Sequence, residues 1–288
     1  MDTEFVEILK VLEASLFSTD IQPDMAALKA TLRNTWSAGD YDHFSRFMEN
    51  DARLFYERLN VATGSRLLDV ACGSGQLALW AARDGMKVVG VDIAANLVER
   101  ANVRAHAERL DASFVEGDAE ALPFEDAGFD VVTSLIGAMF APRPVLVARE
   151  LLRVCKPGGM IAMGNWTQQG FVGQMFRTIS RFIAPSGMPA PTLWGDETVV
   201  RERFGAGVKD LKMTRRNYCF NYPFSPGDVV EFFRAYYGPT KRAFASLDLL
   251  DANELRKELE SLWNLHNRAN NDVTVVHAEY LEVIAVKR

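Results

Sequence analysis

The residues best suited to chemistry lie in a glycine-rich turn that directly follows a short apolar run. The run RLLDVAC brings Asp69 to the end of an expected strand, and Ala71, Gly73 and Gly75 follow it before a helix begins. Glycines let backbone N–H groups approach a ligand at a helix N-terminus, where the helix dipole favours negative charge. Asp69 would repel a pyrophosphate, however, and it suits a ligand that carries an ammonium group. The turn therefore predicts a site for a small organic cofactor.

Two more carboxylates end the next two expected strands. Asp92 closes KVVGVDI, where it can accept hydrogen bonds from two ribose hydroxyls. Asp118 closes ASFVEGD and could accept from an exocyclic amino group of a purine. Gly73, Gly75 and Ala78 also satisfy the GxGxxG/A spacing of dinucleotide-binding folds. An NAD-dependent oxidoreductase is therefore one alternative for this chain.

These residues need a scaffold, and the hydrophobic pattern indicates which one. Apolar strand-like runs alternate with helical patterns, which predicts a parallel sheet, with strands at about 66–72, 87–93, 112–118, 129–136 and 160–166. Residues 1–60 predict three helices, interrupted near Pro23 and Gly39. A short helix and a covering loop are expected over 170–207. The rest of the chain predicts strands at 210–224 and 273–288, with helices between them at 228–245 and 253–268.

The order of the motifs resembles that of a known family. LLDVACGSG, VVGVDI, EGDAEALPF, FDVV and LLRVCKPGG follow one another as in class I S-adenosylmethionine-dependent methyltransferases, over about residues 64–166. GDAEALPF and the CKPGG turn are most similar to the type 11 branch, which includes ubiquinone and menaquinone biosynthesis methyltransferases. The resemblance implies an α/β, Rossmann-like, doubly wound seven-stranded sheet whose last strand is antiparallel. Around it we expect an N-terminal helical cap at 1–60 and a methyltransferase domain at 61–288, with insertions after strands 5 and 6, at about 166–207 and 223–270.

Carried over position by position, the resemblance implies S-adenosylmethionine as the cofactor. Its expected binding residues lie in the turn and at the strand ends: Asp69, Ala71, Gly73, Gly75, Asp92, Ile93, Asp118, Ala119 and Leu135. The methionine moiety would lie against the turn, the ribose on Asp92, and the adenine between Ile93 and Asp118. Four residues of the helical N-terminus could close over the cofactor: Thr35, Trp36, Tyr41 and Arg46.

Candidates for catalysis are few, and no acid/base pair stands out. His266 near the end of the last helix, and Tyr236 and Tyr237 in an aromatic stripe, are candidates, although each also fits a structural role. The sulfonium is already an activated methyl donor, so a base is needed only for an acceptor that must lose a proton. Cys72 fits a small packing residue better than a nucleophile.

Composition excludes several classes of protein. The 288 residues carry 32 Lys and Arg against 38 Asp and Glu, a net charge of −6, and no long basic run, which disfavours a nucleic-acid partner. The three cysteines form no CxxC pair, so neither a disulfide framework nor a metal site is predicted. No export signal or membrane-crossing run is visible. We expect a cytoplasmic protein without membrane insertion, as a monomer or homodimer.

We therefore expect a methyltransferase that moves the methyl of S-adenosylmethionine to an O, N, C or S nucleophile of a small molecule by in-line displacement. An NAD-dependent oxidoreductase is one alternative, although Asp69 and Asp118 count against it. A cofactor-binding scaffold without turnover is another, and kinetic measurements would distinguish it.

Overall fold

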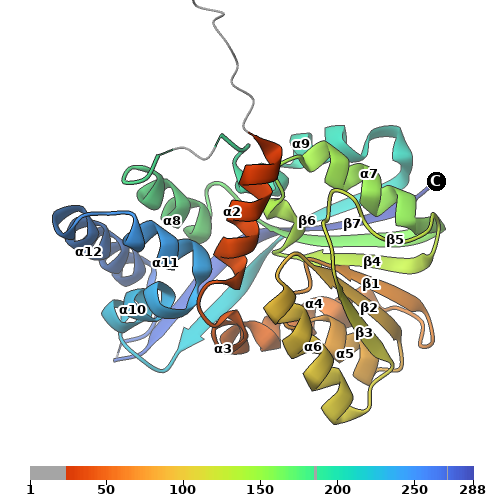
Figure 1. Ribbon diagram of the computed structural model, residues 1–288, viewed down its shortest axis with the longest axis horizontal. Helices are drawn as coiled ribbons and strands as arrows, with labels where there is room; N and C mark the ends of the chain where they lie inside the picture. The colour runs from red at the N-terminus through yellow and green to blue at the C-terminus, as the bar shows by residue number, and fades with distance from the viewer. Residues whose placement is uncertain (1–23, 185–186, 271) are drawn as a thin grey trace, which may run out of the picture.

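Seven strands form one mixed sheet in the order β3-β2-β1-β4-β5-β7-β6 (Figure 1). The computed structural model describes residues 24–184, 187–270 and 272–288, so the helix expected around residues 5–12 lies outside the described part. The strands are β1 Arg66–Val70, β2 Lys87–Asp92, β3 Ala112–Glu116, β4 Phe129–Leu135, β5 Cys155–Trp166, β6 Val208–Tyr222 and β7 Thr274–Lys287.

Helices precede the sheet and connect its strands. Before β1 come α2 Met25–Ser37, α3 Tyr41–Ser45, the 3-10 turn η1 Arg46–Met48 and α4 Glu49–Leu59. Within the parallel part lie α5 Ala78–Arg83, α6 Ala95–Glu108, η2 Ala138–Phe140 and α7 Pro144–Val154. Between β5 and β6 lie α8 Phe171–Ser180, η3 Pro191–Gly195, α9 Glu197–Phe204 and η4 Gly205–Gly207. Between β6 and β7 lie α10 Pro226–Tyr236, α11 Gly238–Ala245 and α12 Leu249–His266.

The strand pairing sets where a ligand can bind. β1 pairs in parallel with β2 on one side and with β4 on the other, so the chain reverses its direction of winding beside β1. Ligands of open α/β sheets bind beyond the carboxyl ends of the strands at such a point. β7 runs antiparallel to both β5 and β6, which confirms the expected seven-stranded sheet with an antiparallel last strand.

The sheet lies between two layers of helices, and its central strands are apolar and buried. Leu67, Leu68 and Val70 of β1 are fully buried, as a central parallel strand covered on both faces requires. In Figure 1, α4, α5 and α6 cover one face, and α7 and α9 lie on the other. The helices α8, α10, α11 and α12 gather at the far end of the sheet, and α2 lies between them and α6.

Three expected elements differ from the observed ones. The single helix expected over 228–245 is two helices, because Pro239 starts a new helix and the residues before it leave helical geometry at Tyr237. β5 begins at Cys155, because the CKPGG turn itself joins the strand, with a register shift against β4. The segment after β5 holds the helices α8 and α9 where one short helix and a loop were expected.

A partly buried cluster of charges connects the N-terminal helices with the glycine turn. Arg104 of α6 contacts Asp42 at 3.5 Å and Glu49 at 2.5 Å, and it donates to the backbone oxygen of Ser74 at 3.2 Å.

Among the described residues, none of the helices is both long and apolar enough to pass through a bilayer.

Candidate active site

The turn after β1 is built from left-handed backbone conformations. Ala71, Gly73 and Gly75 have φ values of 56°, 55° and 88°, a region that favours glycine. The amide of Cys72 donates to Val91 at 3.1 Å, and the amide of Gly75 donates to Cys72 at 3.0 Å. A Cβ added to Gly73 would lie 3.4 Å from the ring of Tyr41. The same carbon would lie 3.1 Å from Oε1 of Gln76, so glycine keeps the narrow space between the turn, Gln76 and Tyr41 free of a side chain.

Asp92 is fixed against this turn by backbone amides. Its Oδ2 accepts from the amide of Gly73, and its Oδ1 accepts from the amide of Ala94, both at 2.9 Å. Burial raises the pKa of the Asp92 carboxyl, and these amide hydrogen bonds partly oppose that rise. A carboxylate has about four acceptor sites, so Asp92 keeps capacity for hydroxyl groups of a ligand.

Asp69 is a second buried carboxylate in the same place. Thr133 donates to its Oδ1 at 2.9 Å. Burial raises the pKa of Asp69 to about 7, and the nearby charge of Asp92 adds to the rise. Within the described part of the chain, neither Asp69 nor Asp92 forms an ion pair. Two buried acids without a basic partner suit a ligand that brings its own positive charge.

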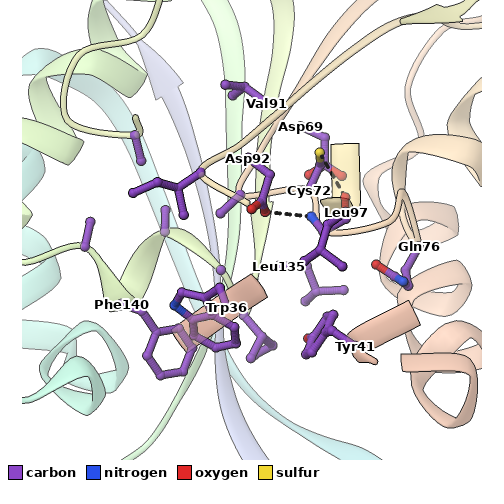
Figure 2. Close-up of a pocket in the computed structure, with 18 of the residues that line it drawn as sticks. Trp36, Tyr41, Asp69, Cys72, Gln76, Val91, Asp92, Leu97, Leu135 and Phe140 are labelled. Atoms are coloured by element: carbon purple, nitrogen blue, oxygen red, sulfur yellow. Dashed lines mark hydrogen bonds between the residues drawn. The ribbon is translucent and has the colours of Figure 1, made fainter. Parts of the chain in front are cut away.

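Both carboxylates face a large cavity, which we call the cofactor pocket. Its empty volume is about 1080 Å³, open mouth included. The sequence-predicted residues that line it are Trp36, Tyr41, Asp69, Ala71, Gly73, Asp92, Ile93, Asp118, Ala119 and Leu135. Figure 2 shows Trp36, Phe140 and Tyr41 on one side of this pocket and the two carboxylates on the other.

Three other predicted residues lie outside the cofactor pocket. Gly75 supports the turn from behind, against Leu79 and Phe114. Thr35 donates its hydroxyl to the backbone oxygen of Thr31, one turn earlier in α2. Arg46 extends into solvent and reaches Asp42 at 3.5 Å.

Sequence reasoning missed several residues that line the cofactor pocket. Lys29 of α2 forms an ion pair with Asp118 and a second one with Glu120, at 2.6 Å. Gln76, directly after the glycine turn, donates to the hydroxyls of Ser74 and Ser45, and its position beside the turn was an available signal. Tyr218 comes from β6, and no local pattern connects it with the turn.

A second, smaller cavity adjoins the first, and we call it the apolar chamber. The two share Trp36, Tyr41, Met48, Ile136 and Phe140. The other residues of the chamber come from α3, β5, α8, β6 and α10 or its end: Phe44, Trp166, Val172, Met175, Phe220, Phe233 and Tyr237. The site therefore has a polar part beside the glycine turn and an apolar part beside the insertion helices.

Comparisons with known proteins agree with this geometry. Residues 68–163 match the family described as "Methyltransferase domain". The chain is 37% identical to the uncharacterized protein Rv1405c of Mycobacterium tuberculosis, over 91% of this chain and 96% of that protein. It is 36% identical to the 27-O-demethylrifamycin SV methyltransferase of Amycolatopsis mediterranei, over 44% of this chain and 50% of that enzyme. The chain belongs to the S-adenosylmethionine-dependent methyltransferase family.

A solved structure shares the fold of this methyltransferase. The phosphoethanolamine N-methyltransferase 2 of Haemonchus contortus, in complex with S-adenosyl-L-methionine, has a TM-score of 0.53 and 22% identity, over 83% of this chain and 52% of that one. The family, the enzyme class and S-adenosylmethionine as cofactor are thus confirmed, and the methyltransferase expectation is preferred to the nicotinamide alternative.

The catalytic candidates predicted from the sequence differ in whether they line one of the two cavities. Tyr237 lines the apolar chamber. Tyr236 contacts the rings of His43 and Phe232 outside both cavities. His266 packs on Phe171, and its Nε2 lies 3.2 Å from Gln174. Cys72 is buried, and burial raises the pKa of its thiol well above the usual range, as expected of a packing residue.

Proposed function

We propose that this methyltransferase transfers the methyl group of S-adenosylmethionine to an O, N, C or S nucleophile of a small molecule. One observation carries the proposal: Asp69 and Asp92 are buried carboxylates without ion-pair partners among the described residues, and both face a cavity that continues into an apolar chamber. S-adenosylmethionine would supply an activated methyl on a sulfonium together with a cationic ammonium group. The pocket offers the complementary negative charge.

The residues around the pocket divide the cofactor between them in this proposal. Asp69 would face the ammonium group, beside Gly73 and Leu135. Asp92 would accept from the ribose hydroxyls, because its oxygens have acceptor capacity beyond the two amides. The adenine would lie near Ile93, Asp118 and Ala119. Since Lys29 already contacts Asp118, it would share that carboxylate with the base.

The chain contributes positioning and exclusion of water. Trp36, Tyr41 and Phe140 stand where the cofactor pocket meets the apolar chamber. Their rings can hold an acceptor against the reacting methyl and keep water away from it. Alignment of this kind can contribute several kcal/mol to catalysis, about 7–11 in well-oriented model reactions.

Other features belong to the same proposal. The name of the Amycolatopsis relative gives oxygen as that enzyme's acceptor atom, so oxygen is the first atom to test here. We retain the division into a cap at 1–60 and a methyltransferase domain at 61–288, a monomer or homodimer, and a cytoplasmic location. The free thiols of Cys72, Cys155 and Cys219 support a reducing compartment.

Calorimetry tests the function. Titration with S-adenosylhomocysteine should show saturable binding, and a panel of small hydroxyl, amino and thiol acceptors should yield that product from S-adenosylmethionine. If the intact protein binds neither cofactor nor product, the proposal is wrong. Binding without turnover across a broad panel would favour the scaffold alternative.

A further inference from the structure

The apolar chamber has walls of one chemical kind. Eight of its twelve lining residues are aromatic, and the other four are Met48, Ile136, Val172 and Met175. None of the twelve is charged, and the chamber lies wholly within the described residues. The chamber therefore differs sharply from the cofactor pocket, which holds Asp69, Asp92 and Lys29.

The rings of the chamber are held by one another. Trp36 and Phe140 have centroids 5.0 Å apart at 62°, and Phe44 and Phe233 have centroids 4.8 Å apart at 89°. Such edge-to-face pairs restrict ring orientation and leave ring faces and edges for a further aromatic partner. The empty volume of the chamber, open mouth included, is about 340 Å³, against about 1080 Å³ for the cofactor pocket, so the chamber suits a compact group. Its aromatic walls favour a planar one.

Its polar groups are few and uncharged. Tyr41 and Tyr237 contribute hydroxyls, and neither hydroxyl has a hydrogen-bond partner in the part of the chain that the structure describes. Each can donate to or accept from a hydroxyl group of a ligand. A charged ligand would lose its hydration here without a counter-charge in the walls.

We propose that the apolar chamber binds the uncharged, planar ring of an aromatic hydroxyl compound, and that the hydroxyl oxygen of this compound receives the methyl group. This inference rests on the proposed methyl transfer. The hydroxyl proton of the acceptor passes to solvent at the open mouth of the cofactor pocket, and the hydroxyl oxygen forms a bond to the methyl carbon. The carbon–sulfur bond breaks with its electron pair left on sulfur, so the products are an aryl methyl ether, S-adenosylhomocysteine and one proton.

The acidity of the acceptor follows from what the walls lack. No histidine, carboxylate or amine lines the apolar chamber within the described residues. Burial raises the pKa of the Tyr41 and Tyr237 hydroxyls, so neither is ionised at neutral pH and neither can act as a base. An aromatic hydroxyl loses its proton far more readily than an aliphatic one, and it therefore needs less help from the protein than an aliphatic hydroxyl does.

Four probes of similar size test the inference by calorimetry, with the protein saturated by S-adenosylhomocysteine. They are 2-naphthol, 2-naphthoate, 2-naphthylmethylammonium and 2-decalol. We expect 2-naphthol to bind about tenfold or more tightly than each of the others and to be converted to 2-methoxynaphthalene with S-adenosylmethionine. The inference would be overturned if 2-naphthoate, 2-decalol or 2-naphthylmethylammonium bound as tightly as 2-naphthol or more tightly. Tight binding of the ammonium compound would indicate that the aromatic rings form a cation–π site. Failure of S-adenosylhomocysteine itself to bind would count against the proposed function instead.

A matched pair of variants places the binding in the chamber. Phe233 lines it, whereas its neighbour Phe232 on α10 is also buried but lines neither cavity. Phe233→Leu should weaken 2-naphthol binding about threefold to tenfold, through loss of aromatic contacts, and leave S-adenosylhomocysteine binding unchanged. Phe232→Leu should change neither. Equal effects of the two variants on 2-naphthol would overturn the assignment.

A milder variant keeps the test valid if Phe233→Leu does not fold. Tyr237→Phe retains the ring and removes only the hydroxyl. This variant should bind 2-naphthol about threefold more weakly, which corresponds to the loss of one hydrogen bond, and should bind naphthalene as the parent does. Equal weakening of both compounds, or of neither, would contradict the proposed contact.

Discussion

Asp69 should make cofactor binding depend on pH. Its pKa rises from 3.8 to about 7 on folding, because the carboxyl is buried. The folded chain thus keeps a proton that the unfolded chain loses near pH 4. The stability that this group contributes is complete below pH 4 and is lost as the pH rises through 7. A cationic ammonium beside it requires the ionised form, so the affinity for S-adenosylhomocysteine should increase about tenfold from pH 6 to pH 8.

Calorimetry at pH 6, 7 and 8 measures this slope, and Asp69→Asn is the matched variant. The asparagine variant should bind more weakly at pH 8 and show a flat profile. In the absence of ligand it should unfold at a higher temperature than the parent at pH 8, because it carries no buried charge. A parent affinity that falls toward pH 8 would contradict the assigned role of Asp69.

Asp92 should be the most sensitive position for binding. Asp92→Asn keeps the size of the side chain but has one acceptor oxygen where the carboxylate offers two, so it cannot accept from both Gly73 and Ala94. We expect calorimetry to show that this variant binds S-adenosylhomocysteine about tenfold or more weakly than the parent. Asp126→Asn, at an exposed carboxylate paired with Arg153, is the control and should bind as the parent does. Unchanged affinity in Asp92→Asn would exclude the ribose role.

The residues predicted from sequence share one property. Asp69, Asp92 and Asp118 end successive expected strands, and parallel strands bring their carboxyl ends to one edge of the sheet. Lys29 and Tyr218 reach the same pocket from α2 and β6, which only tertiary packing brings near. Local patterns carry no trace of that packing, so these residues could not be found in the same way.

At the scale of elements, the sequence predicted the strands better than the helix boundaries. Each of the first five expected strands exists, because buried parallel strands are short apolar runs bounded by turns. The break at Tyr237 was missed because its aromatic stripe continues from α10, even though Pro239 follows. That break matters for the site, because it brings Tyr237 to the apolar chamber while Tyr236 faces His43.

Helix α2 should depend on Lys29 for its docking. Lys29 is mostly buried and pairs with Asp118 and with Glu120, whose side chain is fully buried and also contacts Arg143 at 2.7 Å. Lys29→Ala should lower the free energy of unfolding by about 1–3 kcal/mol, less than a fully isolated buried charge would, because Arg143 remains. Urea unfolding measures this loss, and limited proteolysis should show faster cleavage within α2.

Arg33 provides the control on the same helix. It pairs with Glu116 at 3.3 Å, and about half of each side chain is exposed. Arg33→Ala should change the free energy of unfolding by less than about 1 kcal/mol, because exposed ion pairs contribute little. If Arg33→Ala lowered the free energy of unfolding as much as Lys29→Ala does, the docking of α2 would not depend specifically on the buried ion pairs of Lys29.

At the scale of the whole molecule, the site is formed by segments that are far apart in the sequence. The apolar chamber combines Trp36 from α2, Phe140 after β4, Trp166 from β5, Phe220 from β6 and Tyr237 between α10 and α11. Its aromatic residues were visible in the sequence only as core stripes. Their arrangement around one cavity requires the N-terminal helices and the helices between β6 and β7 to pack together, which no periodicity expresses.

That packing has a point where the two backbones nearly touch, and it gives the last prediction. A Cβ on Gly238, the first residue of α11, would lie 2.0 Å from the carbonyl oxygen of Thr35 in α2. Gly238→Ala must therefore separate the helices, at a cost of about 1–3 kcal/mol in unfolding free energy. Because α2 carries Lys29 and Trp36, S-adenosylhomocysteine should also bind more weakly. Gly128→Ala, whose nearest contact would be an ordinary 3.4 Å, should be neutral in both measurements. A Gly238→Ala protein with unchanged stability and affinity would show that the two sets of helices do not close over the site together.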